Sequence, residues 1–159
     1  MKQKELSRWL RAVVAVGWGL CALLAFVVGP LLAQECALGE PRLAWLEWPC
    51  LGVLWLGIGL VAAALGFAWK IFAEIGRDNS FCLENARRLR AISILALADT
   101  LLCAAVMLAL LFLRALHPGL FLLLLLISAG GAGITIASAA LSHLTVKAAQ
   151  MQDENDLTI

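Results

Sequence analysis

Residues 69–90 read WKIFAEIGRDNSFCLENARRLR. This is the one long interval between apolar runs that is rich in both charge and turn-forming residues. Five of its side chains are basic, namely Lys70, Arg77, Arg87, Arg88 and Arg90. The flanking sequence on both sides is apolar over lengths that suit a lipid bilayer. We therefore interpret this interval as a loop outside the membrane that connects the second and third membrane spans.

The apolar runs define the fold class. Apolar residues make up 63% of the 159 residues and charged residues 14%, with a mean hydropathy of +0.94. In soluble domains about 45–50% of the residues are apolar and about 25% are charged. A membrane span needs roughly 20 apolar residues, and lipid offers unpaired backbone groups no partner, so the spans must be helical. We therefore predict an all-α, polytopic membrane protein: one domain, an up-down bundle of four transmembrane helices, spanning at about residues 12–33, 51–70, 91–113 and 118–143.

The basic residues predict the orientation. Ten of the twelve lie before the first span, between the second and third, or after the fourth, and only Arg42 and Arg114 lie in the other two connections. Positively charged loops stay on the cytoplasmic side. We therefore predict that both termini, the loop 71–90 and the tail 144–159 are cytoplasmic, and that the loop 34–50 lies outside.

The fourth helix is predicted to extend into the cytosol. Leu141, Leu144, Ala148 and Met151 recur at steps of three and four residues, which is the spacing of one helix face. Farther inside the membrane, the small residues Ala129, Gly133 and Ala137 recur at four-residue steps, beside Gly130 and Gly131, and this spacing lets helices approach closely. For this stripe we favour packing within one bundle over a dimer interface, and the formation of a homo-oligomer is an open alternative.

Two connections have local signals. The short turn Arg114–Gly119 predicts that the third and fourth helices form an antiparallel hairpin. In the basic loop, one of residues 78–80 (Asp, Asn, Ser) is expected to cap a helix that begins near Phe81. Phe81, Asn85 and Leu89 then share a face, and an amide between apolar residues needs hydrogen-bond partners if it is buried. We predict an internal hydrogen bond for Asn85, ahead of direct ligand binding.

The same loop helix is the predicted docking surface for a partner or for the chain's own tail. Glu84 can pair with Arg87 or Arg88 along the helix. The acidic tail can fold back on the arginines. Because each exposed ion pair contributes only about 0–1 kcal/mol, several pairs would have to act together with the burial of apolar side chains of the tail. The residues predicted to take part are Phe81, Glu84, Asn85, Arg87, Arg88, Leu89, Arg90, Glu154, Asn155, Asp156, Leu157 and Ile159.

Asp99 is the only ionisable residue deep inside a predicted span. A carboxyl group in the membrane suggests a functional role by default. Thr135, Ser138 and Trp18 are expected at a similar depth. A protonated Asp99 bonded to one of them would be purely structural, and the alternative is a proton- or ion-coupled role.

No residue pattern indicates catalysis, a metal site or a cofactor. The two histidines, His117 and His143, are predicted on opposite sides of the membrane, and no pair of Cys or His has metal-ligand spacing. The protein is therefore not expected to be an enzyme. Cys36 and Cys50 flank the outer loop, where a disulfide would suit the oxidising side, but sequence alone leaves the pairing open.

Two stretches resemble a known bacterial family. The first runs from Gly76 to Arg90 and contains Ser80-Phe81, Glu84-Asn85 and Leu89-Arg90. The second is Leu141-Ser142-His143 followed by the terminal Glu-Asn-Asp-Leu-Thr-Ile of residues 154–159. Together they resemble the domain of unknown function 2975 family, and the whole chain is similar to its plan of four membrane helices.

The resemblance implies a bacterial inner-membrane protein without an established activity. Genes of this family often lie beside a gene for a small helix-turn-helix regulator. The implied hypothesis is that the cytoplasmic face holds this regulator at the membrane, away from DNA, so that the protein itself binds the bilayer and the regulator but no nucleic acid. The alternatives are a small ion- or proton-coupled transporter that uses Asp99, and a purely structural bundle.

Overall fold

The structure, a computed structural model, describes residues 3–31, 34, 45–76 and 82–156. These ranges are helical apart from short turns and contain no strand. The helices are α1 (Gln3–Leu23), which continues into the π-helical turn η1 (Leu24–Val28), α3 (Glu47–Ile75), α4 (Leu83–Phe112) and α5 (Pro118–Asp156). Four helices are long and apolar enough to cross a membrane. The predicted all-α fold of four membrane-length helices is confirmed.

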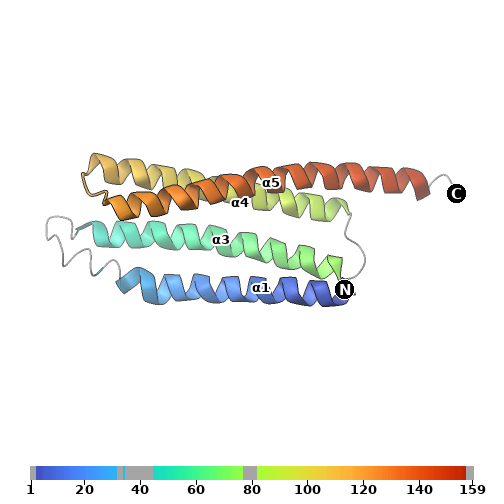
Figure 1. Cartoon of the computed structure of the whole chain (residues 1–159), viewed down its shortest axis with the longest axis horizontal. Coiled ribbons are helices and arrows are strands. Elements are labelled where there is room, and N and C mark those ends of the chain that lie inside the picture. The colour runs from blue at the N-terminus through green and yellow to red at the C-terminus, as the bar shows by residue number, and fades with distance from the viewer. Residues whose placement is uncertain (1–2, 32–33, 35–44, 77–81, 157–159) are drawn as a thin grey trace.

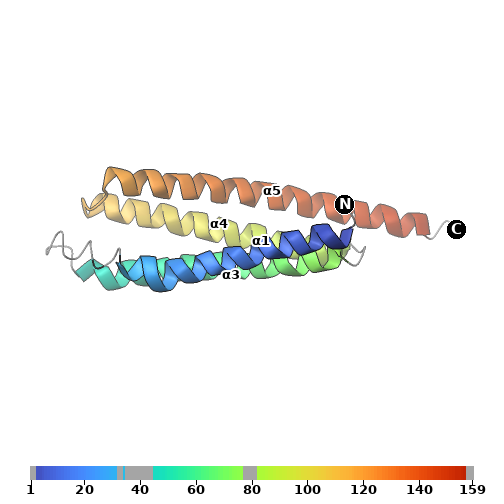
Figure 2. The same ribbon diagram turned by 60° about the horizontal axis from the view of Figure 1, so that its bottom comes forward.

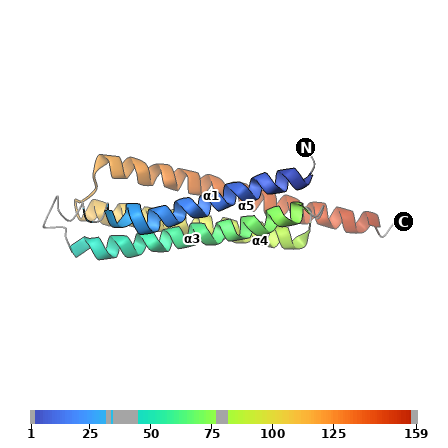
Figure 3. The same ribbon diagram turned by 90° about the horizontal axis from the view of Figure 1, so that it is seen from below.

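The four helices form an open, curved row (Figures 1 and 2). Contacts join α1 to α3, α3 to α4, and α4 to α5, whereas among the described residues no Cα atoms of α1 and α5 approach within 8 Å. Figure 3, a view from below, shows α1 and α3 in front of α4 and α5, with α1 crossing the line of α5. The start of α1, the start of α4 and the end of α5 lie at one end, which we call the basic end (Figure 1).

The helices are longer than the predicted spans. α3 has 29 residues and begins at Glu47, and α4 has 30 residues and begins at Leu83. The additional turns carry charged residues, which belong outside the hydrocarbon region. The predicted extension of the fourth helix is confirmed, because α5 has 39 residues and projects beyond the other helices at the basic end (Figure 1).

Large side chains hold α1 against α3. Trp18 stacks on Trp69 with ring centroids 5.8 Å apart, and its indole N–H donates to the carbonyl oxygen of Ala62 at 3.2 Å. The guanidinium carbon of Arg11 lies 5.7 Å from the centroid of the Trp69 ring, in cation–π geometry. Nearer the basic end, the buried Ser7 hydroxyl donates to the carbonyl oxygen of Phe72 at 2.6 Å.

The π-helical turn frees one carbonyl group that α3 then satisfies. The Gly29 N–H donates to the carbonyl oxygen of Leu24, five residues back. In this register the carbonyl of Ala25 would pair with residue 30, which is Pro30 and has no N–H. The indole of Trp55 donates to this Ala25 oxygen instead, at 3.0 Å. The interruption in α1 is therefore compensated by a side chain from the neighbouring helix.

Small and hydroxyl side chains hold α4 against α5. The covered positions of α5 alternate steps of four and three residues, the spacing that keeps one stripe facing a partner helix: Leu124, Ser128, Gly131, Thr135, Ser138, Ser142, Thr145 and Ala149. Ser93 donates to the carbonyl oxygen of Thr135 at 2.9 Å, and Ser142 donates to that of Ala86 at 2.7 Å. These bonds fix the register of α5 along α4. The predicted antiparallel hairpin is confirmed.

The stripe of small residues predicted to pack inside the bundle does not do so. Ala129 and Ala137 are exposed, and a Cβ added to Gly133 would meet nothing within 4 Å. Gly131, two residues from Gly133, is the glycine of α5 that packs closely, against Thr100 of α4. The prediction was wrong because the packed face of α5 follows a repeat of 3.5 residues and is displaced from the four-residue stripe.

A tight turn joins α4 to α5. Arg114 has a positive φ of 55°, and the amide of Ala115 bonds to the carbonyl of Leu110. This arrangement is a Schellman motif, which closes the end of a helix with a left-handed residue. The His117 Nδ1 accepts a hydrogen bond from the amide of Gly119 at 3.2 Å, so His117 caps the start of α5.

Candidate functional site

The first turn of α4 lies at the basic end. The amides of Asn85 and Ala86 bond to the carbonyl oxygen of Cys82 at 3.1 and 3.2 Å, so Cys82 occupies the N-cap position. Its side chain forms no capping bond. The helix thus begins at Leu83 rather than near Phe81, and the predicted cap within residues 78–80 is wrong in position. Phe81 itself lies outside the described residues.

Asn85 is the most deeply buried polar side chain of this region. It is 1% exposed, and its Oδ1 accepts a hydrogen bond from Arg88 Nη1 at 3.0 Å. Arg88 Nη2 also donates to Glu84 Oε1 at 2.9 Å. The predicted internal hydrogen bond of Asn85 and the predicted Glu84–Arg88 pair are confirmed. Arg88 is therefore occupied by neighbours on its own helix, and Leu89 is half-buried one turn beyond Asn85.

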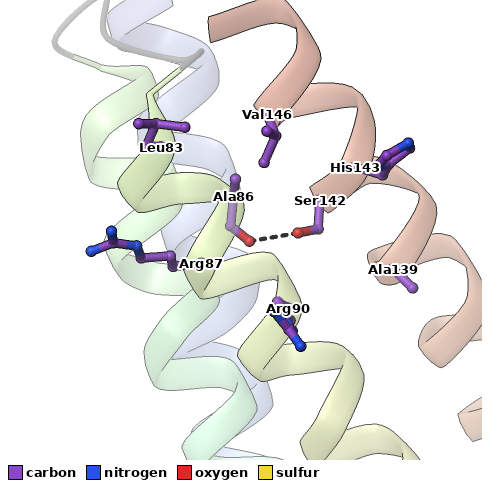
Figure 4. Close-up of a pocket in the computed structure, with 8 residues that line it drawn as sticks. All are labelled: Leu83, Ala86, Arg87, Arg90, Ala139, Ser142, His143 and Val146. Atoms are coloured by element: carbon purple, nitrogen blue, oxygen red, sulfur yellow. Dashed lines mark hydrogen bonds between the residues drawn. The ribbon is translucent and has the colours of Figure 1, made fainter. Parts of the chain in front are cut away.

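Arg87 and Arg90 border a groove between α4 and α5 (Figure 4). Its cavity has a volume of about 390 Å³ and is lined by Leu83, Ala86, Arg87, Arg90, Ala139, Ser142, His143 and Val146. Figure 4 shows Arg87 and His143 directed to opposite sides, with Arg90 between the two helices. Within the described part of the chain neither Arg87 nor Arg90 forms an ion pair.

The hydrogen bond from Ser142 to Ala86 crosses the middle of this groove (Figure 4). It holds the two helices at a fixed separation and leaves the floor apolar. Ser142, His143, Ala139 and Val146 were not among the predicted site residues. The short turn at residues 114–119 was the signal that could have identified them. In an antiparallel hairpin, counting residues outward from the turn along both helices shows which part of α5 lies opposite Ala86.

The predicted docking of the tail remains a prediction. α5 is one continuous helix to Asp156, so its backbone continues away from α4 rather than folding back at Glu154 and Asn155. The described part of the chain excludes the side chains of Glu154, Asn155 and Asp156 and all of Leu157 and Ile159.

Asp99 lies at the interface of α3 and α4. A Cβ added to Gly57 of α3 would meet Asp99 Oδ1 at 3.1 Å, so the carboxyl group rests directly against the glycine backbone. The expected hydrogen-bond partners are engaged elsewhere or lie at another depth. Trp18 donates to Ala62, and Thr135 donates to the carbonyl oxygen of Gly131.

The prediction that Thr135 and Ser138 share the depth of Asp99 is wrong. Thr135 faces Ser93, which is six residues and about 9 Å nearer the basic end than Asp99. Ser138 is buried still nearer that end. The residue of α5 that packs at the level of Asp99 is Gly131, against Thr100. The intramembrane polar residues therefore do not form one cluster.

The remaining predicted residues give no further site. Cys50 is exposed in the first turn of α3, and Cys36 lies outside the described residues, so their disulfide stays a prediction. Among the described residues, no group of three or more His, Cys, Asp or Glu side chains is arranged to hold a metal ion.

Comparison with known proteins agrees with the architecture. The family described as "Protein of unknown function (DUF2975)" matches residues 31–159, which include α3, α4, α5 and only the last residue of the first helical segment, Leu31. The chain belongs to this family. No curated protein and no solved structure matches the chain. With its four membrane-length helices, this DUF2975 member is a multi-pass membrane protein.

Proposed function

We propose that this protein is a non-enzymatic partner in the bacterial inner membrane that holds a small helix-turn-helix regulator at the cytoplasmic surface. The basic end faces the cytoplasm in this proposal, because ten of the twelve basic residues gather in the segments at that end. The partner-binding element is the projecting part of α5.

The observation that carries the proposal is the exposure of apolar side chains on this projection. Ser142 pairs with Ala86, so α5 passes the start of α4 near Thr145 and continues for about 16 Å to Asp156. Leu144 is 61% exposed and Met151 is 63% exposed, both near or beyond the point where α4 begins. Apolar side chains that protrude from a membrane domain are typical of protein interaction sites.

Co-purification of the regulator encoded beside the gene tests the proposal. The intact protein, in detergent, should retain the regulator, and L144S/M151S should bind it at least about tenfold more weakly, since two apolar side chains lose their burial. The matched control is L6S/L83S, which removes two other exposed leucines from the basic end.

A chain cut after Met151 separates the projecting helix from the tail, because it keeps both apolar side chains and removes residues 152–159. Retention of the regulator by this chain would assign binding to the projecting helix, and loss of retention would assign it to the tail. Equal retention by the intact protein and L144S/M151S contradicts the assignment to the projecting helix. No retention by any form contradicts the function.

A second candidate function rests on Asp99. Its carboxyl group lies against Gly57 at the middle of the row, and no described hydrogen bond joins it to Trp18, Thr135 or Ser138. A carboxyl group in the membrane that lacks these bonds is available for proton or ion binding. Uptake of protons into vesicles that depends on this protein and is lost in D99N would support it; unchanged uptake, or none, would exclude it.

A further inference from the structure

We propose that the groove of Arg87, Arg90 and His143 is a binding site for a phosphate group at the membrane surface, most favourably the phosphate of an anionic phospholipid. This site lies between α4 and α5 and is independent of the projecting residues Leu144 and Met151. The site has two parts, a cationic rim and an apolar floor.

The rim has donors that no other described residue of the protein uses. Arg88 is neutralised by Glu84, whereas Arg87 and Arg90 form no ion pair within the described ranges. The described residues that line the cavity include no acidic side chain. Arginine presents its N–H groups in a planar fork that matches phosphate oxygens, and the His143 imidazole adds an N–H donor. Arg90 lies between the helices, whereas Arg87 and His143 are directed to opposite sides, so Arg90 is the donor placed to meet a bound phosphate and Arg87 adds positive charge at one rim (Figure 4).

The chain's own acidic tail does not occupy this groove from its helical part. Glu154 lies eleven residues beyond His143 on the same continuous helix, about 16 Å farther from the membrane.

The floor of the groove favours a lipid over a soluble phosphate. It is formed by Leu83, Ala86, Ala139 and Val146, and the cavity of about 390 Å³ is open toward the surroundings of the two helices. Arg90 directly precedes the long apolar part of α4, which starts at Ala91. A phosphate at Arg90 would therefore be at headgroup depth, with the first part of an acyl chain beside the α4–α5 interface. Basic pockets between membrane helices at the cytoplasmic side bind anionic headgroups.

Native mass spectrometry of the intact protein from mixed micelles with phosphatidylglycerol or phosphatidylcholine tests the site. The unmodified protein should retain phosphatidylglycerol in preference to phosphatidylcholine, and R87Q/R90Q should reduce that retention about tenfold or more, because the charge-assisted contact of Arg90 and the positive charge of Arg87 at the rim are both lost. The matched control R8Q/K147Q removes the same charge from exposed positions outside the groove. A139F fills the groove without changing charge and should weaken retention as well.

Excess inorganic phosphate distinguishes the two sources of the ligand. Retention of phosphatidylglycerol that depends on the arginines and resists inorganic phosphate assigns the site to lipid. Displacement of the lipid by inorganic phosphate alone, with the same dependence on Arg87 and Arg90, supports a phosphate site that does not need the lipid tail.

Two results would overturn the proposal. One is equal retention by the unmodified protein and R87Q/R90Q when both show the same helical content by circular dichroism. The other is an equal loss in R8Q/K147Q, which would reduce the effect to net charge. Since L144S/M151S leaves the groove intact, it should bind lipid normally even if the regulator proposal fails.

Discussion

The α1–α3 and α4–α5 interfaces join pairs of antiparallel membrane helices by different means. Between α1 and α3 most of the described polar and ring contacts involve indole rings, those of Trp18, Trp55 and Trp69, with the Ser7 hydroxyl bond nearer the basic end. Between α4 and α5 the small residues glycine, serine and threonine allow the backbones to approach. Lipid is as apolar as leucine, so neither interface gains from the hydrophobic effect, and both depend on packing and hydrogen bonds.

The two interfaces share one device. Each described hydrogen bond that crosses between helices runs from a side-chain donor to a backbone carbonyl oxygen, at Phe72, Ala62, Ala25, Thr135 and Ala86. The difference lies in the donors, because two of the three α1–α3 bonds come from indoles and both α4–α5 bonds come from hydroxyls, which require a close approach. The α4–α5 interface should therefore be sensitive to side-chain size at Gly131, and the indole part of the α1–α3 interface to the loss of particular donors.

The largest effect is expected for Gly131→Leu. A Cβ at this position would collide with the hydroxyl of Thr100 and lie 3.7 Å from the carbonyl oxygen of Ala96, so a leucine must push α4 and α5 apart. Overpacking of this kind costs about 3 kcal/mol. Unfolding in mixed micelles by increasing fractions of sodium dodecyl sulfate measures the loss.

Gly133→Leu is the matched control for this change. It has the same chemistry on the same helix, two residues away, where an added Cβ meets nothing within 4 Å. It should change the free energy of unfolding by less than about 0.5 kcal/mol. If both variants lose stability equally, the α4–α5 interface is not the size-sensitive contact that the structure indicates.

A smaller effect is expected for Trp55→Phe. This change removes the donor to the Ala25 carbonyl oxygen, and the cost should be about 1–2 kcal/mol. Pro30→Ala supplies a backbone N–H to the same turn, so Trp55→Phe should cost less in that background. The double-mutant cycle on micelle unfolding isolates this coupling. Trp48→Phe, at a 76% exposed position on α3, is the control that should change little.

The sequence was sufficient for the number of helices and for the extension of α5. These features depend on long-range composition, because the length of each apolar run determines a membrane-spanning helix almost independently of packing. Asn85 was also predictable, since an amide on an apolar face needs partners if it is buried.

The lateral arrangement could not be predicted in the same way. The stripe at Ala129, Gly133 and Ala137 and the stripe at Gly131, Thr135 and Ser138 are both small, and only the register with α4 selects the second. Similarly, the depth assigned to Thr135 assumed that the spans were aligned by their ends, whereas the Ser93 bond aligns them by contact. The groove at Arg90 depends on this register, so its α5 wall was missed.

The smallest effects come from single hydroxyl groups of the α4–α5 interface, and they separate packing from hydrogen bonding. Ser142→Ala removes the bond to Ala86, and we expect a cost of about 0.6 kcal/mol, the mean for such bonds between membrane helices. Ser128→Ala is the counterpart on the same stripe, because the Ser128 hydroxyl is buried and, among the described atoms, has no hydrogen-bond partner. Removing an unsatisfied buried hydroxyl should leave stability unchanged or raise it by up to about 1 kcal/mol. Opposite signs, measured under the same micelle conditions, would establish that the hydroxyls contribute through specific carbonyl acceptors, whereas equal losses would mean that they act only by their size.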